Sequence, residues 1–148
     1  MYELIYAMRF TGQATPSSMD GNVLKAATTA PSFTLTATVG SDGLSSAIHP
    51  ADGGEATFTS EVTFTSETSF QEVGMIGFGE GHLLHFSTVG SGYLEASADP
   101  ARKHGTVMWR VDGGEGQFAG ATGLITSNFF VGEDLTVTDH HFGVIFLA

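Results

Sequence analysis

Apolar and polar residues alternate one by one along much of the chain. In residues 32–39 (SFTLTATV) every second position is apolar, and the positions between them are serine or threonine. Residues 56–65 repeat the pattern, with an apolar face (Ala56, Phe58, Val62 and Phe64, interrupted by Ser60) opposite a face of threonine and glutamate. A period of two residues is typical of a β-strand with one buried face. Both segments therefore predict half-buried strands.

Shorter runs of the same kind predict further strands, and no run predicts a helix of ten or more residues. Turn residues separate the runs. Asp42-Gly43 predicts a tight hairpin, and Pro50 with residues 52–54 predicts the end of the returning strand. Residues 13–31 contain two prolines and a glycine and predict a loop. The predicted strands are residues 2–10, 32–39, 44–49, 56–65, 70–78, 82–89, 92–97, 105–111, 124–131 and 135–147.

Many short strands between regularly spaced turns are typical of a sandwich or a barrel. The 20 glycines and 12 phenylalanines support this assignment, because glycine serves tight turns and aromatic residues favour strands. No internal repeat and no linker divides the sequence. We therefore predict an all-β fold, a single antiparallel β-barrel domain over residues 1–148, with little or no helix.

The net charge of the protein limits the kinds of partner that it can bind. The chain has 148 residues and a net charge of −11, with only five Lys and Arg, so a nucleic acid or an anionic membrane surface would repel it. No apolar run is long enough to span a bilayer, and the first residues lack the pattern of a signal peptide. The absence of cysteine excludes disulfides and thiolate chemistry. We expect a cytoplasmic protein.

The last strands carry apolar residues on both faces, in residues 129–131 and 142–147. No helix is available to cover the outer face. We therefore expect a subunit interface there and a homo-oligomer; the alternative is a strand enclosed by long loops.

Residues 114–123 read GEGQFAGATG. Clustered glycines permit positive φ angles and close chain approach, and Phe118 between them can fill the core. Gly116, Phe118, Gly120 and Gly123 therefore have an architectural role.

This stretch resembles the Gly-x-Phe-x-Gly-Ala-x-Gly signature of the allene oxide cyclase-like and dirigent-like β-barrels. The order of strand, turn, motif, long strand, hairpin and final apolar strand is similar too. The resemblance covers residues 55–148 well and the first 50 loosely. It implies a calycin-type barrel that needs no cofactor, forms a dimer or a trimer, and holds a ligand inside. It assigns no catalytic residue.

Six histidines raise the question of a metal site. His82 and His85 are three residues apart, and His140 and His141 are adjacent, so on strands the members of each pair point to opposite faces. This spacing disfavours a metal centre, and we predict neither a metal nor a cofactor.

Asp139 and His141 are two residues apart and share a strand face. A carboxylate beside an imidazole can orient the ring and favour its protonated form, which makes this pair the best local acid–base candidate. The alternative is a solvated pair at the end of a hairpin. His85 is a general acid–base candidate if its face lines the cavity; otherwise it is a hydrogen-bonded structural histidine. Arg110 lies in mid-strand and could stabilise an enolate oxygen, or pair with a surface acid.

Glu72 and Asn128 place polar groups in apolar strands, where they could polarise a carbonyl or an epoxide, or satisfy backbone groups. Trp109, Tyr93 and Phe130 could form the wall of a ligand site or belong to the core. Together with the candidates above, the predicted catalytic residues are His85, Asp139, His141, Arg110 and Glu72, and the predicted substrate contacts are Asn128, Trp109, Tyr93 and Phe130.

These residues and the resemblance lead to one main hypothesis about function. The protein would be a cofactor-independent isomerase, cyclase or ring-opening enzyme that binds a small hydrophobic or aromatic molecule inside the barrel. Two alternatives stay open. One is a non-catalytic, dirigent-like binding barrel, and the other is a structural oligomer whose interior is filled by its own phenylalanines.

Overall fold

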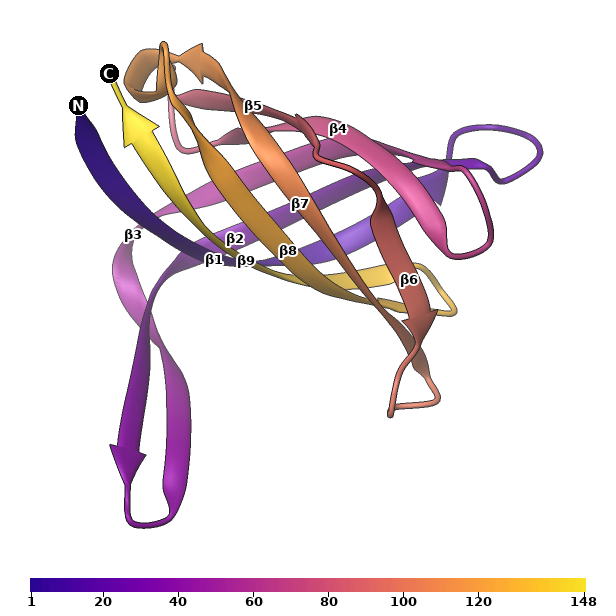
Figure 1. Ribbon diagram of the computed structural model, residues 1–148, viewed down its shortest axis with the longest axis horizontal. Coiled ribbons are helices and arrows are strands. Elements are labelled where there is room, and N and C mark those ends of the chain that lie inside the picture. Colours follow the sequence, from indigo (N-terminus) through magenta and orange to yellow (C-terminus); the bar gives the residue numbers. More distant parts are fainter.

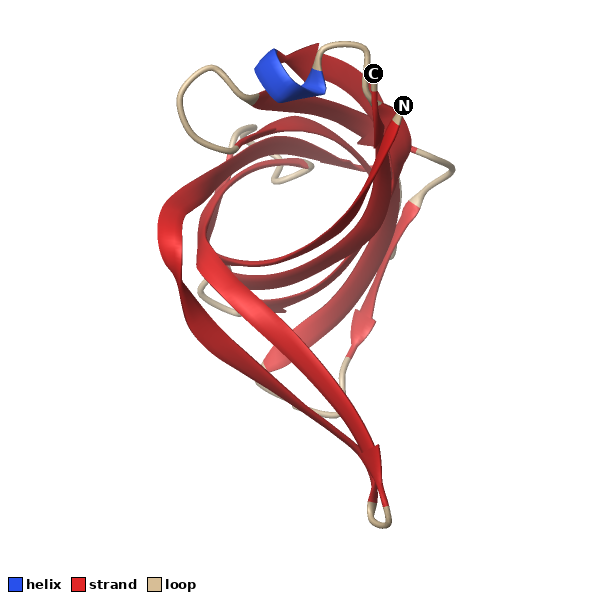
Figure 2. Ribbon diagram, turned by 90° about the vertical axis from the view of Figure 1, so that its left-hand side faces the viewer, coloured by secondary structure: helices blue, strands red, loops and turns tan.

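The computed structural model describes residues 1–148 as one antiparallel sheet of nine strands that curls into a ring (Figures 1 and 2). The all-β prediction is confirmed. The three-residue 3₁₀ helix η1 (Gly116–Phe118) is the only helix, and no helix is long and apolar enough to cross a membrane. The strands are β1 (Tyr2–Pro16), β2 (Val23–Gly40), β3 (Gly43–Phe64), β4 (Ser69–Gly77), β5 (Leu83–Thr88), β6 (Gly92–Ala96), β7 (Arg102–Glu115), β8 (Thr122–Gly132) and β9 (Thr136–Leu147).

Pairing between the two ends of the sheet closes the ring. The strand order is β3-β2-β1-β9-β8-β7-β5-β4, and β3 pairs in turn with β4. The short strand β6 bridges β4 and β7 at one end of the ring. Closure satisfies the backbone groups that would otherwise form exposed edges. It also places β4 and β9 on opposite sides of the ring, four strands apart in either direction.

Alternation decides which side chains face the interior. On β3, Ala56, Phe58 and Ser60 are buried, as the pattern of residues 56–65 predicts. Eighteen buried apolar residues fill the interior, and Trp109 and Phe10 are the largest of those with no exposed surface.

The glycine motif closes one end of the interior, near the two chain termini (Figure 1). Phe118 is buried there, and its ring packs 5.1 Å from that of Phe78, which in turn packs 5.9 Å from Tyr6. Gly123 has a φ of +139°, and a Cβ at this position would collide with the carbonyl oxygen of Val144. Gly116 and Gly120 also have positive φ angles, the conformation that clustered glycines permit.

The prediction of a loop over residues 13–31 holds for residues 17–22 and is wrong for the rest. β1 continues to Pro16, and β2 begins at Val23. Pro31 lies at a shift in the β2–β3 register, and such an irregularity accommodates a residue without an N–H group.

Residues 33–50 form a hairpin that extends beyond the ring, which we call the arm (Figures 1 and 2). The Asp42-Gly43 turn is confirmed at its tip. The predicted strand end at residues 52–54 is wrong, because β3 runs without a break through them. The predicted half-burial of residues 32–39 is also wrong for most of the segment. Nothing packs on the arm, and Val39 is 83% exposed.

Candidate functional site

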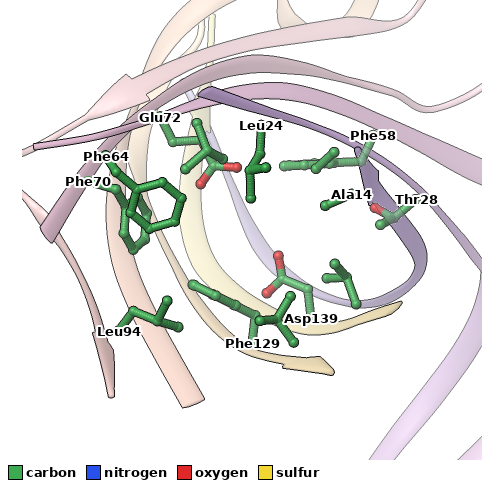
Figure 3. A pocket seen from close by; sticks show the side chains of 14 residues that line it. Ala14, Leu24, Thr28, Phe58, Phe64, Phe70, Glu72, Leu94, Phe129 and Asp139 are labelled. Atoms are coloured by element: carbon green, nitrogen blue, oxygen red, sulfur yellow. The ribbon is translucent and has the colours of Figure 1, made fainter. Parts of the chain in front are cut away.

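A cavity lies inside the ring (Figure 3). Phe118 and Phe78 do not line it. The volume of the cavity itself is about 70 Å³, and the whole hollow with its open end measures about 600 Å³. Eleven of the 14 lining residues are hydrophobic. The other three are Thr28, Glu72 and Asp139. A mostly apolar hollow with a few polar groups is the usual form of a small-molecule site.

Glu72 reaches the cavity from β4 and is 7% exposed. The hydroxyl of Ser60 donates a hydrogen bond of 2.6 Å to its Oε2 atom. Burial raises the pKa of Glu72 to about 8, and the charge of Asp139 adds to this, against the smaller lowering effect of the Ser60 hydrogen bond. At neutral pH the Glu72 carboxyl group is therefore mainly protonated and can donate a proton.

Asp139 reaches the cavity from β9, on the opposite wall. Its Oδ1 atom accepts a hydrogen bond of 2.6 Å from the Ser127 hydroxyl, and its Oδ2 atom lies 2.9 Å from Nε2 of His141. Figure 3 shows the carboxyl groups of Glu72 and Asp139 directed into the same hollow. Two hydrogen bonds stabilise a carboxylate and fix its orientation.

Tyr6 completes the chain of hydrogen bonds behind Asp139. Its hydroxyl lies 2.9 Å from Nδ1 of His141. Burial, together with the charge of Asp139, raises the pKa of Tyr6 well above its usual value, so the phenol keeps its proton. In the tautomer that carries its proton on Nε2, the imidazole donates to Asp139, and Nδ1 accepts a hydrogen bond from the Tyr6 hydroxyl.

Aromatic rings enclose His141 and exclude water from it. The rings of Phe10, Trp109 and Phe58 lie 4.6, 4.9 and 5.4 Å from the imidazole. His141 is 3% exposed. The imidazole acts on the cavity through Asp139, because Asp139 lines the cavity and His141 does not.

Two buried polar atoms in this region have no hydrogen-bond partner, Thr28 Oγ1 and Trp109 Nε1. The Trp109 N–H is near enough to Glu72 to lower its pKa slightly, but its geometry is not that of a hydrogen bond. Thr28 lines the cavity and is 4% exposed. A buried hydroxyl without a partner destabilises the free protein and is available to a ligand.

The structure corrects the predicted positions of His85 and Arg110. On β5, Leu84 and Phe86 face the interior, so His85 lies half-buried on the outer face. On β7, Trp109 faces the interior and Arg110 is exposed on the outside. Neither side chain lines the cavity.

Three predicted substrate contacts also lie outside the ring. Asn128 is exposed, Tyr93 is 47% exposed, and Phe130 is half-buried on the outer face, where it stacks on His104. Trp109 lies inside, so it does not form a common wall with Tyr93. The inward phenylalanine of β8 is Phe129, which lines the cavity.

Sequence reasoning placed Asp139, His141 and Glu72 among the candidates, and the structure brings these three into the interior. Asp139 and His141 share a buried face, which rules out a solvated pair at a hairpin end. Sequence reasoning missed Tyr6, Ser127 and Thr28. Tyr6 could have been found, since it alternates with the apolar Leu4, Met8 and Phe10 on the inward face of β1.

No three or more His, Asp or Glu side chains converge on a point that could hold a metal ion. Comparisons with protein-family models, with curated proteins and with solved structures give no match for this chain.

Proposed function

We propose that the protein is a cofactor-independent enzyme that isomerises, cyclises or opens the ring of a small, neutral, oxygen-bearing apolar molecule held in the cavity. One observation carries the proposal. A protonated carboxyl group, Glu72, and a hydrogen-bonded carboxylate, Asp139, face the same apolar hollow from opposite walls.

These two groups can act as acid and base on one bound molecule. Asp139 would remove a proton from a carbon next to a carbonyl group, while the Glu72 hydroxyl donates a hydrogen bond to the oxygen that gains negative charge. Return of the proton from Asp139 to another carbon gives the isomer and restores the enzyme. With an epoxide, Glu72 would protonate the oxygen as the C–O bond breaks, and Asp139 would take a proton from the neighbouring carbon. The proton on Asp139 then passes to Glu72.

The cavity favours a neutral ligand. An anion would lie in an apolar environment beside the charge of Asp139, which is unfavourable. The unpartnered hydroxyl of Thr28 offers a hydrogen bond to a second polar group on the ligand. The volume of the cavity itself, about 70 Å³, is far below the range of about 300–1,000 Å³ that is typical of pockets for drug-sized ligands, so the site suits only a very small molecule.

Turnover of two simple probes tests the proposal. We expect the protein to convert 3-cyclohexen-1-one to its conjugated isomer, followed by ultraviolet absorbance, or to open cyclohexene oxide to the allylic alcohol, followed by gas chromatography. The variants Glu72→Gln and Asp139→Asn should each lower kcat/KM by about 100-fold or more. Glu61→Gln is the matched control, since Glu61 lies on the neighbouring strand β3 and is exposed.

Full activity in Glu72→Gln would contradict the proposal. Binding of the probes without turnover of either would favour the alternative of a dirigent-like binding protein, which the apolar lining also suits.

We further propose that the ring is a calycin-type barrel of the allene oxide cyclase-like kind. The closure of β3 on β4 and the position of Phe118 at the end of the core support this assignment.

A further inference from the structure

The arm exposes one apolar face that nothing in the chain covers. Cross-strand pairing places Leu35 beside Ile48 and Val39 beside Leu44, so these four side chains lie on the same face of the hairpin. Their exposed fractions are 53%, 42%, 83% and 73%. The opposite face carries mainly threonine and serine. An exposed hairpin with a continuous apolar face is unfavourable in water unless it has a partner.

The outside of the ring has a second uncovered apolar surface, which we call the outer patch. It consists of Ile5 on β1, Phe142 and Val144 on β9, and Leu124 on β8. Val144 pairs with both Ile5 and Leu124, so the patch is continuous across three strands. Ile5, Phe142 and Leu124 are 58%, 54% and 49% exposed.

The arm and the outside of the ring form the two walls of one groove. The outward-facing Arg9 and Thr11 of β1 line this groove together with Phe33, Ile48 and Pro50 of the arm. Arg9 belongs to the same outer face of β1 as Ile5. A body that enters the groove can therefore contact both apolar surfaces.

We propose that this body is a second copy of the chain, and that two copies clasp each other, with the arm of each covering the outer patch of the other. Both surfaces are apolar. In a dimer with a two-fold axis, each arm covers the outer patch of the other copy, so both arms and both patches are buried.

The exposed area agrees with a dimer. If a fully exposed large apolar residue presents about 180 Å², the four arm residues together with Ile5, Leu124 and Phe142 expose roughly 740 Å² per copy. A stable interface of standard size buries about 800 Å² on each partner.

The distribution of charge also favours contact at these surfaces. Two copies with a net charge of −11 repel each other overall. The arm contains one of the 16 acidic residues, Asp42, and the residues of the outer patch are uncharged. Arg9 and His140 lie next to the patch on the outer face, and Glu3 is the acid beside it.

Sedimentation velocity tests the clasp. We expect a wild-type dimer at about 100 µM. Leu35→Asp in the arm and Phe142→Asp in the patch should each raise the dimer dissociation constant at least about tenfold. Thr36→Asp on the other face of the arm is the control and should leave the dimer intact. Circular dichroism establishes that each variant is folded, and a variant in which a short turn replaces residues 37–46 provides a second test, because it should be monomeric.

Cross-linking tests which surfaces meet, and the absence of native cysteine makes it unambiguous. A mixture of Leu44→Cys and Phe142→Cys chains, treated with a flexible bis-maleimide, should give a cross-linked mixed dimer, whereas each variant alone should not. A monomeric wild type at the same concentration would overturn the proposal. A cross-link with Leu44→Cys alone would also overturn it, because the arms would then contact each other.

Discussion

Glu72 is the only buried group whose pKa is raised into the neutral range. Replacing it by glutamine removes this group. Glutamine has nearly the same shape as protonated glutamic acid, and its amide oxygen can accept the hydrogen bond from Ser60. The variant therefore keeps the packing of the site and removes its titration.

The expected effect on stability follows from the difference between the folded and unfolded pKa values, about 8 and 4.5. Between these values the unfolded chain has released the proton of Glu72, and the folded chain still holds it. The wild type must therefore lose stability as the pH rises from 4.5 to 8, and the loss ends above pH 8. A shift of about 3.5 pH units corresponds to at most about 5 kcal/mol, which is a large part of the stability of a typical domain.

Urea unfolding of the wild type and Glu72→Gln from pH 5 to pH 9 at constant ionic strength measures this difference. Other groups titrate in the same range. Burial, for example, lowers the pKa of His140, and this makes the folded state more stable as the pH rises. Such contributions are common to both proteins and cancel in the comparison. We expect Glu72→Gln to match the wild type within about 1 kcal/mol at pH 5 and to exceed it by several kcal/mol at pH 9.

Two parallel stability curves would refute the reasoning, because they would show that Glu72 has the same affinity for protons in the folded and unfolded chain. Glu61→Gln provides the reference, and its curve should run parallel to that of the wild type.

Four further outcomes are expected. The kcat/KM of the proposed reaction should fall as the pH rises through about 8, because Glu72 then loses its proton; a rate that is flat to pH 10 would exclude it as the acid. Thr28→Val should raise the stability of the free protein by about 1 kcal/mol in urea unfolding and weaken the binding of cyclohexanone, measured by calorimetry. Gly123→Ala should lower the stability by about 2 kcal/mol or more, since a Cβ meets the Val144 carbonyl oxygen, whereas Gly40→Ala, in open space, should change it by less than about 0.5 kcal/mol. Phe118→Ala should lower the melting temperature markedly, by the equivalent of about 3–5 kcal/mol.

The alternation of residues along each strand predicted those parts of the site that lie on a single strand. The spacing of Asp139 and His141 places them on one face, and Glu72 alternates with the inward Phe70. Their partners depend on register between strands. Ser127 lies on β8 and Tyr6 on β1, 135 residues before His141, and no local pattern relates them.

Alternation defines two faces of a strand but not which face is inside. The chemistry of His85 and Arg110 favours a place in the cavity, but the opposite faces of their strands carry Leu84, Phe86 and Trp109, and these faces are the buried ones. The arm shows a second limit. Residues 32–39 have the pattern of a half-buried strand, but burial requires a surface to pack against, and the single chain offers none. If the proposed clasp is correct, the pattern describes the dimer.

The packing of Phe118, Phe78 and Tyr6 at one end of the ring affects how a small molecule reaches the cavity. The cavity lies toward the other end, where the hollow between residues 96–103 and 131–135 adjoins it. A substrate of the proposed reaction would therefore pass the residues of this hollow before it meets Glu72 or Asp139.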